Sequence, residues 1–368
     1  MGQTTHYGLI GCGMMGQEHL RNIALLPDTQ VVAIFEPDPE MAAFALTLAP
    51  QAVLVDSIAA LLAVSELDCL VIVSPNFRHV EQLLEIADTR PLPVLVEKPV
   101  FTDPRDLAKM RAFRDSYPAP VWVAMEYRYM PPVAAMLAQA RDATGGIKMV
   151  SIREHRFPFL PKIGDWNRFN RYSGGTFVEK CCHFFDLMRL TTGAEPVRVM
   201  ASGGIDVNHL SETYNGETPD ILDNGYVIVD FDTGARAMLE LCMFAEGSRY
   251  QEEISIVGPD GKIEAHVPGP GRFWNKNIGP APTPQVVISP RSPSGPKVME
   301  IAVDPELLAA GDHNGSTFYQ HQGFLELVRG TRSAPDVSLT DGIEAVRMGL
   351  AAQLSIETKR MVEMSEIT

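Results

Sequence analysis

The sequence has few cysteines, a shortage of basic residues and no long apolar run, and each shortage excludes a class of protein. Its 368 residues include five cysteines and no CxxC pair, which argues against a disulfide framework or a zinc finger. Its 31 lysines and arginines stand against 46 acidic residues, a net charge of −15, which opposes general binding to nucleic acid or to an anionic membrane surface. No apolar run approaches the ~20 residues that span a bilayer. The start of the sequence shows no signal peptide, so the cytoplasm is the expected compartment.

The sequence does contain an ordinary globular composition, with 45 % hydrophobic and 21 % charged residues, at a length that suits two domains. In the first third, short apolar runs alternate with amphipathic segments of helical length, and the runs lie at 7–10, 31–35, 53–55, 69–73, 94–96 and 121–124. Such runs are typical of strands that are buried on both faces of a parallel sheet. The sequence therefore predicts a doubly wound α/β domain over residues 1–124.

The pattern changes in residues 125–368, where alternating β-type runs follow one another with few helices between them. The expected strands lie at 148–155, 197–202, 226–231, 235–244 and 252–257. Helices are expected at 131–143, 174–190 and 341–362, and the proline- and glycine-rich stretch 268–296 is expected to be a loop. These patterns predict a second, α+β domain with a largely antiparallel sheet.

A glycine-rich loop follows the first expected strand directly. It reads Gly11-Cys12-Gly13-Met14-Met15-Gly16. The three glycines allow a tight turn, a close approach of the backbone to a pyrophosphate and close packing of the next helix on the strand. Glu36 lies 20 residues after the last glycine, where a carboxylate can bind both ribose hydroxyls of NAD and would repel the extra phosphate of NADP. The loop predicts NAD as the cofactor; the alternative is a structural glycine turn with a surface glutamate.

Two further segments lie at the carboxyl ends of expected strands, where ligands of an open α/β sheet bind. After the strand at 69–73, the residues expected beside the cofactor are Ser74, Pro75, Asn76 and His79, although a histidine at a helix start is as often structural. Glu97-Lys98-Pro99 closes the next strand. Lys98 is expected to point into the crevice from there.

The segments described so far carry a resemblance to a known family, together with Tyr127-Arg128-Tyr129 and the stretch 174–186. The chain resembles the Gfo/Idh/MocA family, which is the glucose–fructose oxidoreductase and inositol dehydrogenase group. The resemblance covers nearly the whole chain. It implies a Rossmann domain and a C-terminal α+β domain whose open sheet often supports oligomers, here a homodimer or homotetramer. It also implies oxidation or reduction of sugars, cyclitols and their derivatives with NAD or NADP.

The expected helix at 174–190 carries Glu179, His183 and Asp186, spaced so that all three side chains can share one face. Such a polar stripe is costly unless it is hydrogen-bonded or faces a wet cleft. The stripe matches the family's D-x-x-x-H-x-x-D pattern, except that Glu179 replaces the usual aspartate and Lys180-Cys181-Cys182 replaces small or apolar residues. A buried structural cluster is the alternative. Adjacent cysteines point to different helix faces, so no metal site is expected.

The resemblance and the sequence add Arg128, Trp166 and Arg168 as candidates for binding the substrate. Trp166 can stack on the C–H face of a sugar, although a place in the core is equally compatible with a tryptophan there, and Arg128 suits a packing role equally well. Glu126 stands where the family often has an amide, and His313 starts a helix near the expected cleft.

These residues predict an NAD-dependent dehydrogenase that interconverts a secondary alcohol and a ketone. His183 can accept the alcohol proton without an unusual pKa, with Asp186 or Glu179 orienting its ring. Lys98 can stabilise the developing alkoxide or, if desolvated, accept the proton itself, and the sequence leaves that choice open. The alternatives are a lyase or glycosidase that uses NAD transiently, and a non-catalytic NAD-binding sensor.

Overall fold

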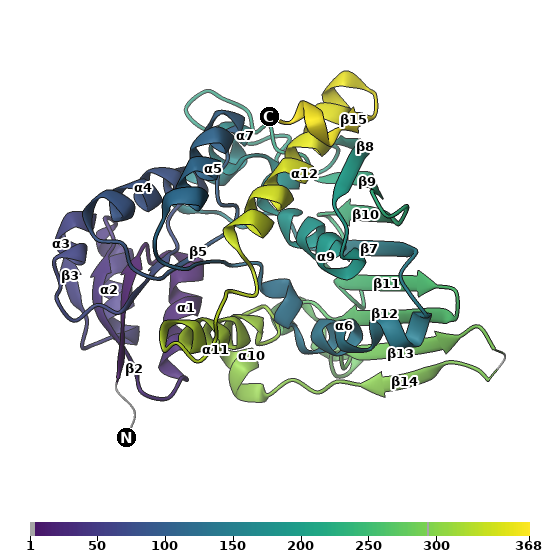
Figure 1. Cartoon of the computed structure of the whole chain (residues 1–368), viewed down its shortest axis with the longest axis horizontal. Coiled ribbons are helices and arrows are strands. Elements are labelled where there is room, and N and C mark those ends of the chain that lie inside the picture. The colour runs from purple at the N-terminus through teal and green to yellow at the C-terminus, as the bar shows by residue number, and fades with distance from the viewer. Residues whose placement is uncertain (1–3, 293) are drawn as a thin grey trace.

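The computed structural model describes residues 4–292 and 294–368 and contains two sheets that stand side by side (Figure 1). The first has the order β3-β2-β1-β4-β5-β6, and every pairing in it is parallel. Its strands are β1 (Thr5–Ile10), β2 (Thr29–Phe35), β3 (Val53–Val55), β4 (Cys69–Ile72), β5 (Val94–Val96) and β6 (Val121–Val123). This is the strand order of a Rossmann fold, with the change of direction between β1 and β4. The predicted parallel sheet is confirmed.

The helices that connect these strands are α1 (Met14–Ala24), α2 (Pro39–Leu48), α3 (Ile58–Leu62), α4 (His79–Thr89) and α5 (Leu107–Ser116). Side-chain caps stand at the start of α2 and α3 and of the turn before α5. The side chain of Asp38 accepts backbone N–H bonds at the start of α2, Ser57 does so for α3, and Asp103 does so for the turn that leads into α5. Helix α1 differs, because it begins at Gly13 with no side-chain cap and no acidic residue in its first turn.

The second sheet has the order β14-β13-β12-β11-β7-β10-β9-β8-β15 and is antiparallel apart from the β7–β10 pair. Its strands are β7 (Met149–His155), β8 (Pro196–Gly204), β9 (Asn224–Phe231), β10 (Arg236–Cys242), β11 (Glu252–Gly258), β12 (Gly261–Val267), β13 (Gln285–Pro290), β14 (Lys297–Glu300) and β15 (Val362–Glu363). The predicted, largely antiparallel sheet is therefore confirmed.

Helices cover one face of this second sheet, with α6 against β12 and β13 and α12 against β8 (Figure 1). The helices of this part are α6 (Pro131–Thr144), α7 (Asn170–Ser173), α8 (Thr176–Glu179), α9 (Cys182–Thr192), α10 (Pro305–Ala310), α11 (Ser316–Val328) and α12 (Leu339–Thr358). The opposite face exposes apolar side chains of β7 to β10, namely Met149, Met200, Tyr226, Ile228 and Met238. None of the described helices is both long and apolar enough to cross a bilayer.

Three of the predicted elements are wrong in detail. The helix expected over 341–362 ends at Thr358, and Val362 belongs to β15. The helix expected over 174–190 is interrupted at Lys180 and Cys181, so that Glu179 ends α8 and His183 belongs to α9. Helix α8 also starts later than expected, at Thr176, because Gly174 and Gly175 have φ of 85° and 83° and are not helical. The stretch expected as a loop over 268–296 contains the strand β13. The sequence did not reveal this strand, because a short strand bounded by prolines gives little alternation to detect.

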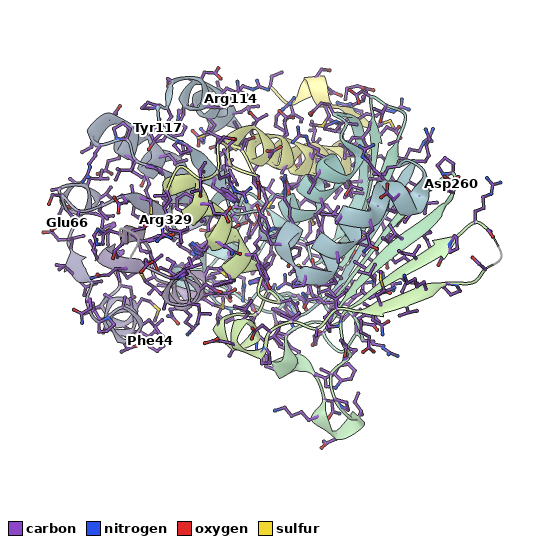
Figure 2. All side chains as sticks on the ribbon, turned by 60° about the horizontal axis from the view of Figure 1, so that its bottom comes forward. Phe44, Glu66, Arg114, Tyr117, Asp260 and Arg329 are labelled. Atoms are coloured by element: carbon purple, nitrogen blue, oxygen red, sulfur yellow. The ribbon has the colours of Figure 1, made fainter. Side chains whose placement is uncertain are left out.

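Helix α11 follows the strands of the second sheet along the chain but packs against the first sheet. Phe324 contacts Tyr7 and Trp122 edge-on, at centroid distances of 6.3 and 6.5 Å. Beyond the C-terminal end of α11, Arg329 donates to the Thr5 hydroxyl at 3.0 Å and to the carbonyl of Asp28 at 2.7 Å, at the start of β1 and β2 (Figure 2). The buried apolar side chains of both sheets therefore form one continuous core.

Candidate active site

The glycine loop between β1 and α1 has the shape of a phosphate-binding cradle. A Cβ atom on Gly11, where φ is 93°, would lie 2.7 Å from the backbone nitrogen of Ser74, and one on Gly16 would lie 2.7 Å from the carbonyl of Gly11. Packing therefore demands both glycines. Gly13 is different, because a Cβ there would meet nothing within 4 Å, so a ligand can approach its backbone. With the uncapped N–H groups of α1, this backbone fits a pyrophosphate.

Within the predicted cofactor segment, Glu36 lies against the glycine loop. Its Oε2 accepts a hydrogen bond from the backbone N–H of Cys12 at 2.5 Å, and its Oε1 accepts one from Asp38 at 2.9 Å. Cys12 itself is fully buried, whereas Met14 is exposed at the mouth of the loop and lines the cleft with Met15. The carboxylate thus stands at the carboxyl edge of the parallel sheet, beside the cradle.

The turn after β4 is held by its own hydrogen bonds. The Ser74 hydroxyl donates to Gln82 at 2.6 Å, and the amide of Asn76 donates to the carbonyl of Ser173 at 3.3 Å. The buried ring of His79 lies between two carbonyl oxygens, 2.8 Å from that of Pro99 and 3.0 Å from that of Ser74. His79 therefore ties this turn to the segment after β5, and Pro75 leads into the turn.

Glu97 and Lys98 follow β5, and the Lys98–Pro99 peptide bond is cis. Glu97 Oε1 lies 3.0 Å from Nε2 of the buried His19 on α1, whose Nδ1 lies 2.7 Å from Nε2 of His321 on α11. Burial opposes ionisation of Glu97, but the hydrogen bond and charge of His19 outweigh it and lower its pKa. This chain of contacts fixes the backbone from which Lys98 projects.

A cleft lies between the Rossmann domain and the second sheet, and it brings together Lys98, Glu179 and His183 as the sequence predicts. Its lining also includes Glu18, Glu126, Tyr127, Arg156, Lys162, Asn167, Lys180, Gln251, Arg272, Asp312 and His313. Lys98 Nζ donates to the backbone carbonyl of Glu179 at 3.0 Å. Burial favours a neutral Lys98, but the neighbouring acidic groups, Cys182 and Glu97 first among them, outweigh it and raise its pKa. Lys98 is therefore a charged donor.

His183 differs from Lys98 in its charge. Its buried ring stacks on Tyr127 at a centroid distance of 4.2 Å and an interplanar angle of 10°. Its Nδ1 has no hydrogen-bond partner in the described part of the chain. Burial, reinforced by the positive charges of Lys98 and Lys180, holds the pKa of His183 well below its usual 6.5. The ring is therefore neutral near pH 7 and able to accept a proton.

Glu179 also keeps an unused atom at the cleft. Its Oε2 is buried and has no partner among the residues described. Burial raises the pKa of this carboxyl, despite the opposing charges of Lys98, Lys162 and Arg156. A carboxyl group in this condition can both accept from and donate to a hydroxyl of a ligand.

The structure places Asp186 away from the cleft lining, contrary to its expected role of orienting His183. The guanidinium of Arg128 donates to both carboxylate oxygens of Asp186, with Nε 2.5 Å from Oδ2, and its Nη1 donates to the carbonyl of Asp336 at 2.7 Å. Burial outweighs Arg128 and raises the pKa of Asp186. The reason for the difference is that a fully buried carboxylate is satisfied best by a two-pronged arginine partner. Arg128 is thereby committed to this pair.

Trp166 and Arg168 also lie outside the lining of the cleft. Trp166 contacts Phe77 edge-on at 6.3 Å, and the buried Arg168 donates through Nε to Glu212 at 3.1 Å. Asn167, between them, lines the cleft instead. The short turn that carries these residues has two positions of positive φ, at Gly164 and Asp165, so sequence spacing does not foretell which side chain faces inward.

Sequence reasoning missed a buried charged group beside His183. Lys180 Nζ lies 2.8 Å from Glu154 Oε1 and donates to the Tyr127 hydroxyl. Glu154 pairs across the sheet with Glu252, and both are buried. A detectable signal existed, because Glu154 stands at an inward position of the alternating β7, with Ile152 and Val150 as the other inward residues.

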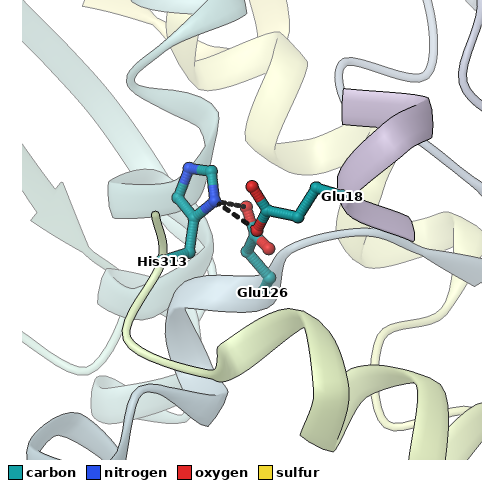
Figure 3. A group of neighbouring side chains, drawn as sticks. All are labelled: Glu18, Glu126 and His313. Carbon is teal, nitrogen blue, oxygen red and sulfur yellow. Dashed lines mark hydrogen bonds and ion pairs between the residues drawn. The ribbon is translucent and has the colours of Figure 1, made fainter. Parts of the chain in front are cut away.

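A second charged group, Glu18, Glu126 and His313, lies on the cofactor side of the cleft (Figure 3). His313 Nδ1 is 2.9 Å from Glu18 Oε1 and 3.6 Å from Glu126 Oε1. The Thr317 hydroxyl is 2.8 Å from Glu18 Oε1 and 2.6 Å from Glu126 Oε2. Burial opposes the charge on Glu18 and on His313, but it is outweighed at both. The charge and hydrogen bond of His313 lower the pKa of Glu18 to about 2, and the charges of Glu126 and Glu18 raise that of His313 to about 9. One atom from each member of the trio lies within 4.8 Å of the other two.

Comparison with known proteins gives two family matches that follow each other along the chain. The model described as "Oxidoreductase family, NAD-binding Rossmann fold" matches residues 5–125, and that described as "Oxidoreductase family, C-terminal alpha/beta domain" matches residues 141–364. Inositol 2-dehydrogenase of Rhizobium meliloti is 26 % identical over 263 residues, which are 71 % of this chain and 76 % of that protein. The rhizopine catabolism protein MocA of Rhizobium meliloti is 26 % identical over 236 residues, 64 % of this chain and 70 % of that one.

Solved structures share the whole fold. Levoglucosan dehydrogenase, solved with NADH and levoglucosan, has a TM-score of 0.80 at 19 % identity, over 98 % of this chain and 100 % of that one. A myo-inositol dehydrogenase from Corynebacterium glutamicum has a TM-score of 0.74 at 22 % identity, over 98 % of each chain. The family matches, in agreement with the glycine cradle, confirm the prediction of an NAD-binding Rossmann domain. The chain belongs to the Gfo/Idh/MocA oxidoreductase family and is an oxidoreductase with an NAD-binding domain and a C-terminal α/β domain.

Proposed function

We propose that this oxidoreductase is an NAD-dependent dehydrogenase that converts a secondary alcohol of a sugar, cyclitol or related polyol to a ketone, or catalyses the reverse reaction. One observation carries the proposal: Lys98 of the Rossmann domain and His183 of the second domain line the same cleft, one charged and one neutral. Oxidation of an alcohol requires such a pair, a donor to the reacting oxygen and an acceptor for its proton. The inositol dehydrogenases among the relatives support the substrate class.

When bound, NAD supplies the acceptor for the hydride that leaves the carbinol carbon. Gly11, Gly13 and the first turn of α1 would hold its pyrophosphate, and Glu36 would bind the adenosine ribose. The carboxylate of Glu36 favours NAD over NADP, because it would face the additional phosphate of NADP.

The two catalytic side chains have complementary tasks in this mechanism. The neutral ring of His183 accepts the hydroxyl proton as the C–H bond breaks, and the ammonium group of Lys98 donates a hydrogen bond to the oxygen while negative charge develops on it. The raised pKa of Lys98 keeps it protonated, which favours His183 as the proton acceptor. Glu179 would bind a neighbouring hydroxyl of the substrate, and its unpartnered Oε2 supports this role.

The purified protein should be incubated with NAD and a panel of sugars and cyclitols while the absorbance of reduced nicotinamide is followed. Formation of reduced cofactor in proportion to ketone supports the proposal. Product without net reduced NAD would identify a lyase or glycosidase that uses the cofactor transiently. Cofactor binding with no product from any compound of the panel would favour a sensor.

We further propose that the uncovered face of the second sheet joins copies of the chain into a homodimer or homotetramer. Exposed apolar side chains of several adjacent strands lie on this face, among them Tyr226 and Ile228 on β9. Burial of such a patch is favourable in water. A monomer in size-exclusion chromatography with light scattering would contradict the proposal, and Ile228→Arg should lower the oligomeric state of the wild type.

A further inference from the structure

The second-domain wall of the cleft is positively charged, in a chain whose net charge is −15. Arg156 follows β7, Lys162 precedes the turn at 163–168, and Lys180 lies between α8 and α9; all three line the cleft. A fourth cation of this wall, Arg272, already pairs with Asp312. A neutral polyol is bound through hydroxyl groups, for which uncharged or acidic side chains suffice. Three cations on one wall therefore need another explanation.

Two of these cations share one counter-ion. Lys180 Nζ lies 2.8 Å from Glu154 Oε1, whereas Arg156 Nη1 lies 3.5 Å from the same oxygen. The neighbouring Glu252 compensates little, because burial beside Glu154 raises its pKa to about 7 and leaves it only partly ionised. Lys180 takes the close contact, so the guanidinium of Arg156 is incompletely neutralised.

The third cation lacks a carboxylate partner altogether. Lys162 Nζ lies 5.5 Å from the centroid of the Trp166 ring, and no described carboxylate oxygen comes within 4.0 Å of it. Burial lowers its pKa, which reflects the cost of keeping a charge there. A bound anion would remove that cost, since a desolvated cation is expensive only while it is unpaired.

Glu179, on the same wall, does not take the place of such an anion. Its carboxylate is buried with Oε2 unpartnered and forms no ion pair with Lys162 or Arg156 within 4.0 Å. Burial favours its protonated form, despite those cations. Glu179 therefore suits a hydroxyl group of the substrate, and the two cations are left for a different group.

We propose that the substrate carries a carboxylate as well as the reacting alcohol, and that Arg156 and Lys162 bind this carboxylate. The inference rests on the proposed dehydrogenase function and names its substrate class, a sugar acid or cyclitol acid. A guanidinium fork and an ammonium group are the donors that carboxylates bind most strongly. A neutral sugar in the same place would desolvate both cations without neutralising either, so the site also discriminates against it.

The first measurement compares kcat/KM of the full chain with NAD on matched pairs of compounds. D-glucuronate and D-gluconate are the acids, D-glucose and myo-inositol the neutral partners, and D-glucose 6-phosphate tests whether any anion suffices. Because hydrogen bonds between charged groups are stronger than those to a neutral hydroxyl, we expect ~100-fold higher kcat/KM for the better acid, mainly through KM. An equal or higher value for the neutral compounds overturns the inference while leaving the dehydrogenase function intact; a preference for the phosphate ester overturns the assignment to a carboxylate.

The second measurement tests the two side chains. Lys162→Met and Arg156→Met should each lower the ratio of acid to neutral kcat/KM by ~10-fold or more. Lys297→Met, which removes an exposed lysine of β14, is the matched control and should leave the ratio unchanged. A ratio that neither cleft variant alters overturns the inference.

A binding measurement keeps the inference separate from the function on which it rests. If no compound is oxidised, the dehydrogenase proposal fails, and calorimetry with D-glucuronate on the NAD-loaded protein decides about the carboxylate site. Binding that Lys162→Met weakens at least ~10-fold supports the site. Binding that is absent, or equal in wild type and variant, refutes it.

Discussion

The cleft has a wall on the Rossmann side, the cofactor wall, and a wall on the second domain, the substrate wall. The two walls differ in whether their buried polar side chains are hydrogen-bonded to the protein. On the cofactor side, Glu97 lines the cleft and the rings of His19 and His79 lie behind it, and all three are hydrogen-bonded to other protein groups. Nδ1 of the neighbouring His321 is the exception in this cluster, because it has no partner in the described residues. On the substrate wall, Glu179 Oε2 and His183 Nδ1 have no partner in the described residues. Buried polar atoms are nearly always paired in folded proteins. Glu97 and the two histidines beside it are therefore held by bonds within the protein, whereas Glu179 and His183 each keep a buried polar atom that no described residue binds.

The largest expected effect tests the cofactor wall's contribution to chemistry. Lys98→Ala should lower kcat by ~1000-fold, because it removes a preorganised donor to the developing alkoxide. The affinity for NAD, measured by fluorescence titration, should stay nearly constant. Lys109→Ala on α5 is the matched control, because its exposed ammonium only pairs with Asp106. Turnover near the wild-type value would remove Lys98 from the catalytic site.

A substitution on the substrate wall should change both the rate and its pH dependence. His183→Asn should lower kcat by roughly 300-fold, since it removes the proton acceptor. The pKa of His183 is lowered well below 6.5 by burial, so the wild-type rate of oxidation should fall only below pH 6.5, where the ring becomes protonated and cannot accept a proton. The variant's pH–rate profile should lack this acid limb. If the variant is slow but keeps the limb, His183 only binds substrate.

The buried ion pair of Asp186 and Arg128, behind the substrate wall, should contribute to stability but not to the pH dependence of the oxidation rate. Asp186→Asn leaves the nearly buried guanidinium of Arg128 without its counter-ion, which should lower the free energy of unfolding by about 3 kcal/mol. Chemical denaturation measures this change. Glu195→Gln is the control and should cost less than about 1 kcal/mol, because Glu195 is exposed and Arg189 keeps Asp341 as a partner. A shifted acid limb in Asp186→Asn would restore Asp186 as the group that orients His183.

The smallest expected effect concerns the choice between NAD and NADP, which differ by one additional phosphate. Wild-type kcat/KM should be ~100-fold higher with NAD than with NADP, because a carboxylate beside a phosphate dianion costs a few kcal/mol. Glu36→Ser combined with Pro37→Arg should shift this preference towards NADP. Glu40→Ser, at an exposed position of α2, should leave it unchanged. Equal Michaelis constants for the two cofactors in the wild type would contradict the role of Glu36.

The same comparison explains what the sequence could predict. The cofactor wall is built from local signals, since three glycines within six residues and a glutamate after β2 define it through backbone geometry. The substrate wall depends on where one helix breaks. The place of Glu179 and His183 in the cleft was predicted correctly because both still face it after the break. Asp186 instead pairs with Arg128, which lies 58 residues away in sequence. Lys162 lies in an irregular turn and has no periodicity from which its place in the cleft could be inferred.

The return of α11 to the first sheet has a consequence for motion. Because α11 contacts α1 and α12 then continues from it to the second sheet, the two halves are connected by packed helices as well as by the segment after β6. A domain hinge is easiest where a few loop residues alone carry the change of backbone angles. Helix α12 packs on β8 and α9 of the second half and also on α5 and β6 of the first, so closure would have to shift α12 within a tightly packed core. The cleft should therefore have nearly the same width with and without ligand, and its choice among substrates should come from fixed side chains and not from closing.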